Sequence, residues 1–394
     1  MSDGEVHARL APSSAGRWVH CPGSVMMEEL VPELPDAEDT GKEGTAAHWV
    51  AAEVLNSMLT DAPHSAAKYL GATAPNGAII TLEMVEAVDV YTNHVLGITA
   101  AGVRPRIEMG VRMRGVHPEH AWGTADAVVA DAVNSVLYVR DFKYGWGLVE
   151  PRGNKQLLLY AIGALEEIHA AGNPVPEHLD LGIVQPRPYH PIGKVRTWRL
   201  PTSELNAYVA ELATAATEAM GANPRTIVGS DACKHCPARH DCPALNAAVN
   251  DVLQWVDAAQ PMNLNGPQIG KQLTELKMAQ ELLNARITGL EAQAAAIIKS
   301  GKSVNGWSLR PGQRRTVWDK PVEEVIAFGA LMGADLSKPG AITPKQAEAL
   351  LKSMALGKEV VAALAGYSKV EGSGLKLVPA EKDNKLAKEI FSHD

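Results

Sequence analysis

Two aspartates and a lysine lie in neighbouring segments whose alternation is typical of β-strands. Asp126 is near the start of one apolar segment, and Asp141 and Lys143 end the next. Successive strand residues point to opposite faces, so Asp141 and Lys143 continue an apolar face, where charges are costly unless paired or bound to metal. Metal-dependent phosphodiester hydrolysis needs such a set: carboxylates hold divalent cations that activate water, and a lysine supplies positive charge. A surface ion pair between Asp141 and Lys143 is the alternative.

Three further polar side chains accompany this set. Gln156 and Tyr160 are four positions apart in a predicted helix that follows the lysine, so they lie on one face of that helix. His48 lies in an otherwise apolar helix nearer the N-terminus, where a single histidine is more often a core residue than a ligand. Its role as a ligand depends on whether the fold brings it to the carboxylates.

The four cysteines have the spacing of one metal site. Cys233, Cys236 and Cys242 form a C-x2-C-x5-C pattern, and Cys21 is the only other cysteine. The set fits an iron–sulfur cluster or a zinc ion, and zinc could also recruit His20, His235 or His240. Unconnected reduced thiols are the remaining interpretation. A shared site would join the N-terminal segment to the end of the sheet domain.

The middle of the chain predicts a mixed sheet that would position these residues. The order α, β, β, β, α, β places a crossover helix between the third and fourth strands, which indicates an α/β fold. Helices are predicted at about 46–58 with Thr45 as its cap, 81–97, 154–170 and 203–220. Strands are predicted within 105–114, 122–130, 135–145, 179–187 and 194–200. The first 45 residues are expected to be irregular, with one short helical piece before a turn at Pro22-Gly23.

The C-terminal third differs in pattern. Apolar residues at a 3-4 spacing, with Gln280 as the one polar interruption, predict a helix of about thirty residues with a coiled-coil-like seam. Intramolecular packing and dimerisation through this seam both stay open. The segment after it predicts a β-hairpin with Pro311-Gly312 in the turn. The remainder, from about 322, is expected to be helical. The seam consists of Leu273, Leu276, Leu283, Ile287, Leu290, Ala294 and Ile297.

Composition excludes several classes of protein. The 394 residues carry a net charge of −8, with 46% hydrophobic and 21% charged residues, which is typical of a globular protein rather than a disordered or fibrous one. Four cysteines are too few for a disulfide scaffold, and neither a membrane-spanning run nor a secretory signal is present. We therefore expect a cytoplasmic protein without a membrane partner. A mildly acidic chain is not a general nucleic-acid coat, so nucleic acid would be bound through local basic patches or metal ions.

Taken together, these motifs resemble the RecB-like branch of the PD-(D/E)XK nuclease superfamily. The resemblance rests on the ordered set His48, Gly123-x-x-Asp126, Asp141-x-Lys143 and Gln156-x-x-x-Tyr160, and covers about residues 10–245. One upstream cysteine with a later C-x2-C-x5-C resembles the iron–sulfur members, the CRISPR-adaptation exonucleases and the AddB-type subunits. The segments SSAGRWVHCPGS and EGTAAH are most similar to a phage and prophage group of such nucleases.

The resemblance implies a fold and a role for each motif residue. The fold is a restriction-endonuclease-like αβββαβ core with a mixed central sheet, followed by a mainly helical C-terminal region. His48, Asp126, Asp141 and the backbone carbonyl of Phe142 would bind Mg²⁺ or Mn²⁺. Lys143 would orient or activate the attacking water, Gln156 would brace the site, and Tyr160 would contact DNA. A [4Fe–4S] cluster, with Zn²⁺ as the alternative, would be bound by Cys21, Cys233, Cys236 and Cys242. The family more often has Glu at the position of Asp141.

The implied activity is that of a metal-dependent DNA exonuclease acting in phage or prophage DNA processing or recombination. Its partner would be linear or single-stranded DNA, contacted by Tyr160. Apart from the resemblance, the basic residues Arg112, Arg114, Arg152 and Lys155, with the aromatics Tyr144 and Trp146 beside the lysine, suit a single strand by phosphate contact and base stacking. Ordinary solvated charge is the alternative for most of these basic residues. A non-catalytic DNA-end-binding or recombination subunit, and a zinc-bound endonuclease, are the alternatives. A second copy or a protein partner could bind the C-terminal region.

Three regions are predicted from these patterns. Residues 1–45 form a segment that contributes one cysteine, 46–250 form the nuclease core with its cysteine cluster, and 251–394 contain a long helix, a hairpin and further helices.

Overall fold

The chain forms two compact units in the computed structural model, Met1–Ala292 and Gln293–Asp394. The boundaries predicted at residues 45 and 250 stay predictions. The structure describes residues 8–31, 41–60, 62–100, 103–257, 263–311, 314–318, 320, 322–337, 343–354, 358–372 and 375–379. In this described part of the chain, no helix is both long enough and apolar enough to cross a membrane.

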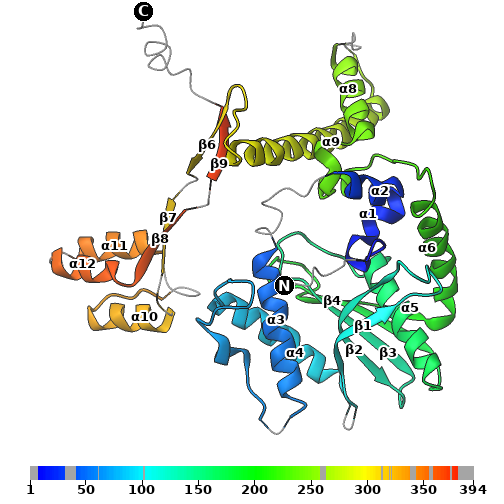
Figure 1. Ribbon diagram of the computed structural model, residues 1–394. Helices are drawn as coiled ribbons and strands as arrows, with labels where there is room; N and C mark the ends of the chain where they lie inside the picture. Colours follow the sequence, from blue (N-terminus) through cyan, green and yellow to red (C-terminus); the bar gives the residue numbers. More distant parts are fainter. Residues whose placement is uncertain are drawn as a thin grey trace, which may run out of the picture. The chain divides into compact units, whose positions relative to one another are not determined.

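A five-stranded mixed sheet lies in the first unit (Figure 1). Its strands, in spatial as in chain order, are β1 (Arg106–Arg112), β2 (Trp122–Asp131), β3 (Val136–Phe142), β4 (His178–Val184) and β5 (Val195–Pro201). β1, β2 and β3 form an antiparallel meander, β4 is parallel to β3, and β5 is antiparallel to β4. The α/β class and the mixed sheet predicted from the sequence are confirmed.

Helices cover both faces of this sheet. Figure 1 shows α3 (Lys42–Ser57) and α4 (Leu82–Gly97) on one side, with α5 (Lys155–Ala170) and α6 (Leu205–Ala219) on the other. α5 is the crossover between β3 and β4, and it begins where the Asn154 side chain accepts a hydrogen bond from the Leu157 N–H at 3.2 Å. It packs close to β1, because a Cβ at Gly163 would lie 2.7 Å from the Val111 side chain.

The N-terminal segment is more regular than predicted. A 3-10 turn (Pro12–Ser14) leads into α1 (Ala15–His20) and α2 (Gly23–Leu30), so the expected turn at Pro22-Gly23 is instead the start of α2. Proline is tolerated there because the first N–H groups of a helix have no partner within the helix. Gly23 N–H donates to the Arg225 carbonyl at 2.8 Å, which fixes α2 against the segment before the cysteine motif.

The first turn of α3 also differs from the prediction. The helix begins at Lys42 rather than at about Ala46, and Thr45 lies inside it. The Thr45 hydroxyl donates to the Gly41 carbonyl at 3.2 Å, so it does not cap the helix. Threonine favours both positions, and only the hydrogen-bond partner distinguishes them.

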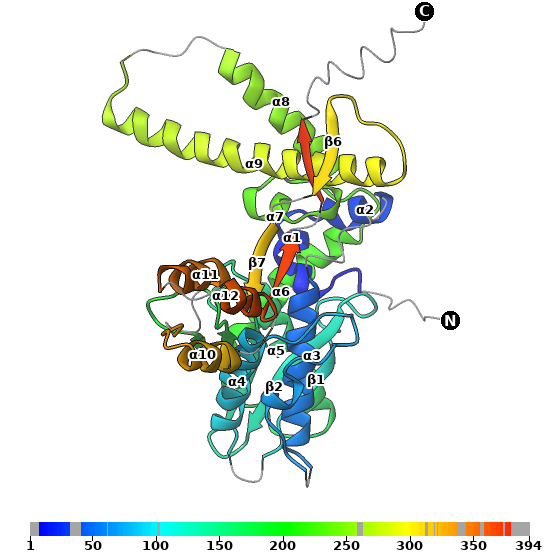
Figure 2. The ribbon, with the colours of Figure 1, turned by 90° about the vertical axis from the view of Figure 1, so that its left-hand side faces the viewer.

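The end of the first unit is helical. Beyond α6 follow α7 (Ser230–Lys234), a 3-10 turn (Pro237–His240), α8 (Pro243–Asp257) and α9 (Gly266–Lys299). Figure 2 shows α1 beside α7, in agreement with the contacts between them, and α2 contacts the 3-10 turn. On α9, Leu282 and Ala285 pack against Leu245 and Val249 of α8, whereas much of the predicted seam is exposed, Leu273 by 54%. Of the predicted seam, Leu283 packs against this cluster, whereas Leu273, Leu276, Ile287 and Leu290 are exposed.

The second unit contains a split β-ribbon. β6 (Trp307–Pro311) pairs with β9 (Leu375–Pro379), and β7 (Arg314–Trp318) pairs with β8 (Ser368–Gly372). The predicted hairpin between β6 and β7 is wrong, because Pro311 stays extended as the last paired residue of β6 instead of entering a turn. Between β7 and β8 lie α10 (Val322–Leu331), α11 (Pro344–Ser353) and α12 (Lys358–Ala365), and the two closing strands were not predicted. The side chains of Arg314 and Arg315, and the C-terminal tail, lie outside the described residues.

A buried arginine joins β3, β4 and α4. Arg140 is 2% exposed; its Nη2 lies 2.8 Å from Asp180 Oδ1, and its Nε donates to His94 Nε2 at 2.9 Å. Gly182 leaves room for this side chain, since a Cβ there would lie 3.0 Å from Arg140 Cδ. Arg140 therefore has a structural role.

Removing the partner of this arginine should destabilise the first unit. Asp180→Ala leaves the buried guanidinium without its carboxylate, so we expect a loss of about 3 kcal/mol in the free energy of unfolding. Urea unfolding followed by circular dichroism measures this loss. Glu86→Ala, at an exposed position of α4, is the control, and equal stability of the two variants would contradict the interpretation.

Candidate functional site

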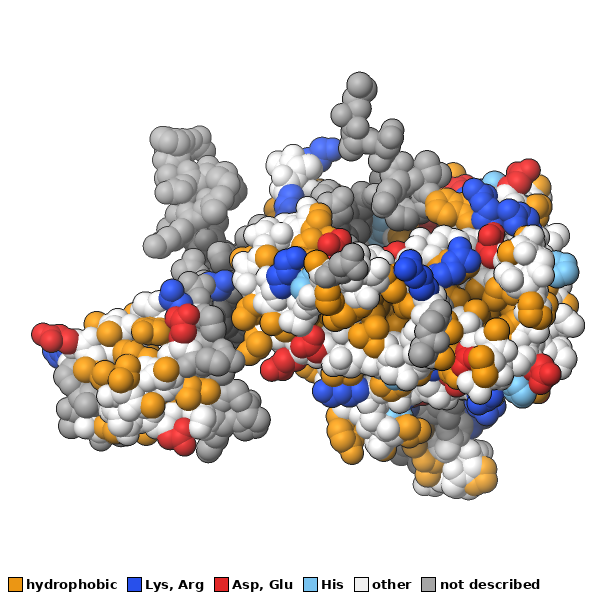
Figure 3. Space-filling view, turned by 90° about the horizontal axis from the view of Figure 1, so that it is seen from below, with side chains coloured by type: hydrophobic (Ala, Val, Ile, Leu, Met, Phe, Trp, Pro, Cys, Tyr) orange, Lys and Arg blue, Asp and Glu red, His pale blue; other side chains and the backbone are white. Residues whose placement is uncertain are grey.

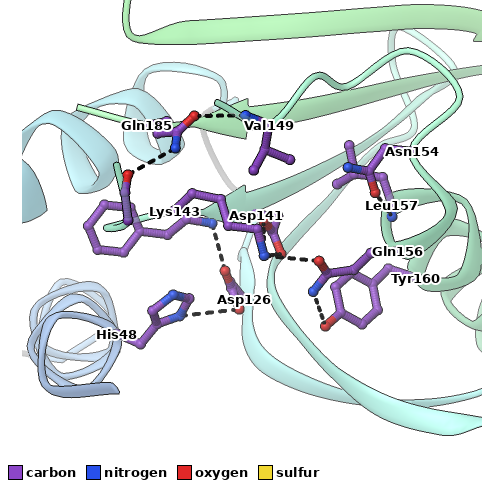
Figure 4. Close-up of polar contacts among 12 residues, drawn as sticks. His48, Asp126, Asp141, Lys143, Val149, Asn154, Gln156, Leu157, Tyr160 and Gln185 are labelled. Atoms are coloured by element: carbon purple, nitrogen blue, oxygen red, sulfur yellow. Dashed lines mark hydrogen bonds and ion pairs between the residues drawn. The ribbon is translucent and has the colours of Figure 1, made fainter. Parts of the chain in front are cut away.

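Asp126, in the middle of β2, meets Asp141 near the end of β3 and Lys143 just after that strand. The Phe142 N–H donates to Asp126 Oδ2 at 2.7 Å, which fixes the Asp126 carboxylate across the two strands. Lys143 Nζ lies 3.0 Å from Asp141 Oδ2 and 3.3 Å from Asp141 Oδ1. Asp126 and Asp141 are 8% and 1% exposed, so this is a buried arrangement rather than a surface ion pair (Figure 4).

α5 supplies a brace for the lysine. Gln156 Oε1 accepts a hydrogen bond from Lys143 Nζ at 2.9 Å, and Gln156 Nε2 donates to the Tyr160 hydroxyl at 3.0 Å. The helix brings both residues to the site on one face, as their spacing predicts. The Tyr160 ring is 5% exposed and belongs to the core between α5 and the sheet. That burial does not favour the expected contact between Tyr160 and DNA, and it makes Tyr160 a support for Gln156.

His48 reaches the same site from α3. Its Nδ1 lies 3.5 Å from Asp126 Oδ1, and its ring centroid lies 5.3 Å from that of Phe142 (Figure 4). Burial by itself lowers the pKa of His48, but the charge and hydrogen bond of Asp126, together with the charge of Asp141, raise it to about 9. His48 is therefore an imidazolium at neutral pH, and a metal ion that binds to it must displace this proton.

The carboxylates and the lysine perturb one another. Burial raises the pKa of Asp141 to about 6 although Lys143 opposes the shift. Burial also acts to raise the pKa of Asp126, but His48 and the Phe142 N–H outweigh it and lower that pKa. For Lys143, burial lowers the pKa, whereas Asp141 and Asp126 raise it above its usual value. The lysine is an ammonium at neutral pH and cannot act as a general base.

Glu108 on β1 joins the site and was not predicted. Ligand atoms of His48, Glu108 and Asp126 all lie within 4.8 Å of one another, which is a group that could hold a metal ion. Burial and Asp126 raise the pKa of Glu108 to about 7, while His48 lowers it. The alternation of β1 could not have indicated this position, because it is interrupted at Glu108, which has a φ of 48°: Ile107 packs with α3 and α4, whereas Met109 packs with α5. The register that places Glu108 beside Asp126 also depends on a connection of irregular residues.

Gln185 fixes the loop after Lys143 and was also missed. This fully buried side chain donates to the carbonyls of Gly145 at 3.0 Å and Gly147 at 2.7 Å, and accepts from the Val149 N–H at 3.2 Å. Trp146 lies between the two held carbonyls and is 64% exposed. The loop therefore presents one aromatic ring to solvent on a fixed backbone.

Arg187 holds the neighbouring helix ends. It lies 2.8 Å from Glu83 and 3.0 Å from Glu43, at the starts of α4 and α3, and its guanidinium stacks 3.9 Å from the centre of the Tyr144 ring. Tyr144 is 3% exposed and belongs to the core formed with α3 and α4. The expectation that Tyr144 offers its ring to a nucleic-acid base is therefore wrong for this arrangement, in which only Trp146 of the two aromatics is exposed.

The predicted DNA-contacting cations have different surroundings. Lys155 Nζ lies 2.5 Å from Glu211, Arg114 lies 3.9 Å from Glu167, and the Arg152 guanidinium lies 5.9 Å from the centre of the Trp198 ring. Arg112 is exposed at the end of β1. On the face drawn in Figure 3, Lys and Arg side chains form small groups among Asp and Glu rather than one continuous field.

The four cysteines line one pocket. Cys21 follows α1, Cys233 lies in α7, Cys236 precedes the 3-10 turn and Cys242 precedes α8, and all four side chains face this pocket. The Ile227 N–H also points to Cys21 Sγ at 3.2 Å. All four are free thiols, and burial raises the pKa of Cys21, Cys233 and Cys236, the last to about 11.

The thiols are not drawn together as ligands of a single ion. A tetrahedral zinc site with Zn–S bonds of about 2.3 Å brings its sulfurs to about 3.8 Å from one another. Among the described residues, no three cysteine sulfurs all lie within 4.8 Å of one another. His20, His235 and His240, which zinc could have recruited, do not line the pocket. The sequence thus predicted that the four cysteines gather, and the structure leaves the bound group open.

The fold and the site define an α/β protein with a candidate metal centre on one end of a mixed sheet and a four-cysteine pocket beside its N-terminal helices. Residues 7–383 match the family described as "Protein of unknown function (DUF2800)", so the chain belongs to that family.

The charge on His48 generates a pH dependence of stability. Its pKa in the folded protein lies above the ordinary value of 6.5, so the pair with Asp126 stabilises the metal-free protein below about pH 6.5, and this stabilisation is lost as the pH rises through about 9. We expect the melting temperature of the chelator-treated protein to exceed that of His48→Gln at about pH 6, and the difference to shrink at about pH 9.5. A difference that stays constant over this range would contradict the shift.

Proposed function

We propose that this protein is a metal-dependent DNA nuclease of the RecB-like branch of the PD-(D/E)XK superfamily, and that it acts as an exonuclease. The observation that carries the proposal is the meeting of Asp126, Asp141 and Lys143 on adjacent strands, with Gln156 bound to the lysine. The surrounding α, β, β, β, α, β order is the one that the resemblance implies for a restriction-endonuclease-like core. A role in phage or prophage DNA processing or recombination is part of the same proposal.

The acidic residues fit a divalent cation. Two carboxylates and an imidazole are ligands that Mn²⁺ accepts and that Mg²⁺ accepts in part. Asp141 Oδ2 is buried and accepts no hydrogen bond from the described residues, and its near neighbour is the Lys143 ammonium. His48, Asp126, Asp141 and the Phe142 carbonyl would hold the ion. When bound, Mg²⁺ or Mn²⁺ supplies positive charge at the scissile phosphate and lowers the pKa of water.

The lysine contributes charge and orientation. As an ammonium, Lys143 can donate a hydrogen bond to the attacking water or to a phosphate oxygen, where its charge favours the transition state. Gln156 limits the positions that the flexible lysine side chain can adopt, and Tyr160 in turn limits those of Gln156. The brace thus lowers the entropy lost when the ammonium is aligned with a substrate.

Trp146 is the residue best placed to contact a DNA strand. Its exposed ring lies three residues after Lys143, and Gln185 holds the carbonyls on both sides of it. Stacking of a base on an aromatic ring contributes about 1–3 kcal/mol and tolerates any sequence. The exposed Arg112 and the guanidinium of Arg152 would contact phosphates.

The cysteine pocket would hold a [4Fe–4S] cluster in this proposal. Four thiols face one pocket, yet their sulfurs are further apart than a single zinc ion requires, and a cluster of several iron atoms separates its ligands more widely. The group would join α1 to the segment between α6 and α8. Zinc remains the alternative ligand for the same cysteines.

The lysine provides the test of the nuclease activity. We expect Lys143→Ala to lower the rate of Mn²⁺-dependent degradation of linear DNA by about 10²–10³-fold, because the ammonium acts on charge that develops in the reaction. Release of nucleotides from end-labelled DNA measures this rate, and Lys194→Ala, at an exposed lysine, is the control. Binding of DNA ends by the wild-type protein without hydrolysis, or full activity of Lys143→Ala, would contradict the proposal.

Metal analysis tests the cluster separately. Anaerobically purified protein should be brown and contain about four iron atoms per chain, and Cys233→Ala should lose both colour and iron. Since the pocket cysteines do not contact the carboxylates, this result is independent of DNA degradation. A colourless protein that contains about one zinc ion per chain would exclude the cluster and favour zinc.

A further inference from the structure

Glu108 is held directly opposite Asp126 across the β1–β2 pair. Ile107 pairs with Ala127 and Met109 with Ala125, so the register puts the two acidic residues face to face. Like charges directly opposite each other destabilise a sheet. Glu108 also has a φ of 48°, which a residue with a Cβ seldom adopts. No lysine or arginine among the described residues forms an ion pair with Glu108, and the basic side chain beside the two carboxylates is His48, whose charge acts to lower the pKa of Glu108.

A buried hydroxyl beside these residues also has no partner. Tyr91 of α4 is 2% exposed, and its hydroxyl forms no hydrogen bond among the described residues. Its ring stacks on Phe142 with 4.8 Å between centroids, and after burial the charges of Asp126, Asp141 and Glu108 raise its pKa. A buried hydroxyl without a partner costs about 1–3 kcal/mol. A hydrated cation among these carboxylates would supply an oxygen for it.

The geometry separates two positions for a cation. Ligand atoms of His48, Glu108 and Asp126 lie within 4.8 Å of one another, and Asp141 does not belong to this group. Asp141 instead faces Lys143, on the other side of Asp126. Asp126 is common to both positions, because Oδ2 lies toward β3 at the Phe142 N–H whereas Oδ1 lies toward His48.

We propose that His48, Glu108 and Asp126 bind a second divalent cation, and that Asp126 bridges it to the cation bound by Asp141. The cation bound by Asp141 is that of the proposed function, on which this inference rests. His48, which the proposed function gave to that cation, is here assigned to the second cation. An imidazole and two carboxylates favour Mn²⁺ over Ca²⁺, which prefers oxygen ligands alone. Glu108 is exposed, so the second position is open to ions from solvent. Paired cations that share a carboxylate are typical of phosphodiester-cleaving sites.

The stoichiometry of Mn²⁺ binding tests this inference. We expect equilibrium dialysis, with bound Mn²⁺ counted by elemental analysis, to give about two ions per chain for the wild-type protein and about one for Glu108→Gln. Glu86→Gln, an exposed position on α4, is the matched control and should keep about two. Asp141→Asn should keep one ion, held at the Glu108 position.

Two outcomes would overturn the inference: a wild-type protein that binds at most one ion, or a Glu108→Gln variant that still binds two. A loss of Mn²⁺ binding caused by misfolding of Glu108→Gln can be distinguished from the loss of one metal site by the melting temperature. Removing one of two opposed charges should leave the melting temperature of the chelator-treated variant equal to or above that of the wild type.

The two proposals fail in different ways. If the wild-type protein degrades DNA but binds a single Mn²⁺, the second metal site is excluded and the nuclease activity is supported. If the number of bound ions drops from two to one in Glu108→Gln but the protein does not degrade DNA, the second metal site is supported and the nuclease activity is excluded.

Discussion

The hydrogen bond from the Phe142 N–H to the Asp126 carboxylate is the interaction on which the rest of the site depends. It joins β2 to β3 at 2.7 Å and leaves the other carboxylate oxygen facing His48. The negative charge held there raises the pKa of His48 and contributes to raising those of Glu108 and Asp141. One fixed carboxylate therefore acts to raise the pKa of three neighbours from three different elements, beside the larger effect of burial on Glu108 and Asp141. Any cation that binds must compete with the proton on His48.

A second group of contacts keeps the surroundings of this carboxylate rigid. Gln185 and Arg187 both follow β4, and they hold the loop after Lys143 and the first turns of α3 and α4. His48 lies in α3, so the same short segment after β4 supports the lysine on one side and the histidine on the other. The contacts of Gln185 and Arg187 therefore explain how residues from the edge of the sheet, from its centre and from two helices are held together in one site.

The sequence predicted those parts of the fold and site that depend on local pattern. Alternation gave the strands and the common face of Asp141 and Lys143, and an i, i+4 spacing gave the pair Gln156 and Tyr160. Glu108 was missed because its partner depends on strand register, which the irregular connection between β1 and β2 conceals. The β6–β7 hairpin was wrong for a similar reason: Pro-Gly is typical of a turn, but strand partners far along the chain decided the pairing.

The split ribbon of the second unit has a consequence for the order of folding. β6 and β7 are synthesised first, but their partners β8 and β9 follow only after α10, α11 and α12. Bringing β8 and β9 to β6 and β7 closes a long loop and costs conformational entropy, which is offset only when the strands pair. The contacts between α11 and α12 are, in contrast, local in the chain. During translation the three helices can therefore gather before either strand pair exists, and the unpaired edges of β6 and β7 stay open to other strands in that interval.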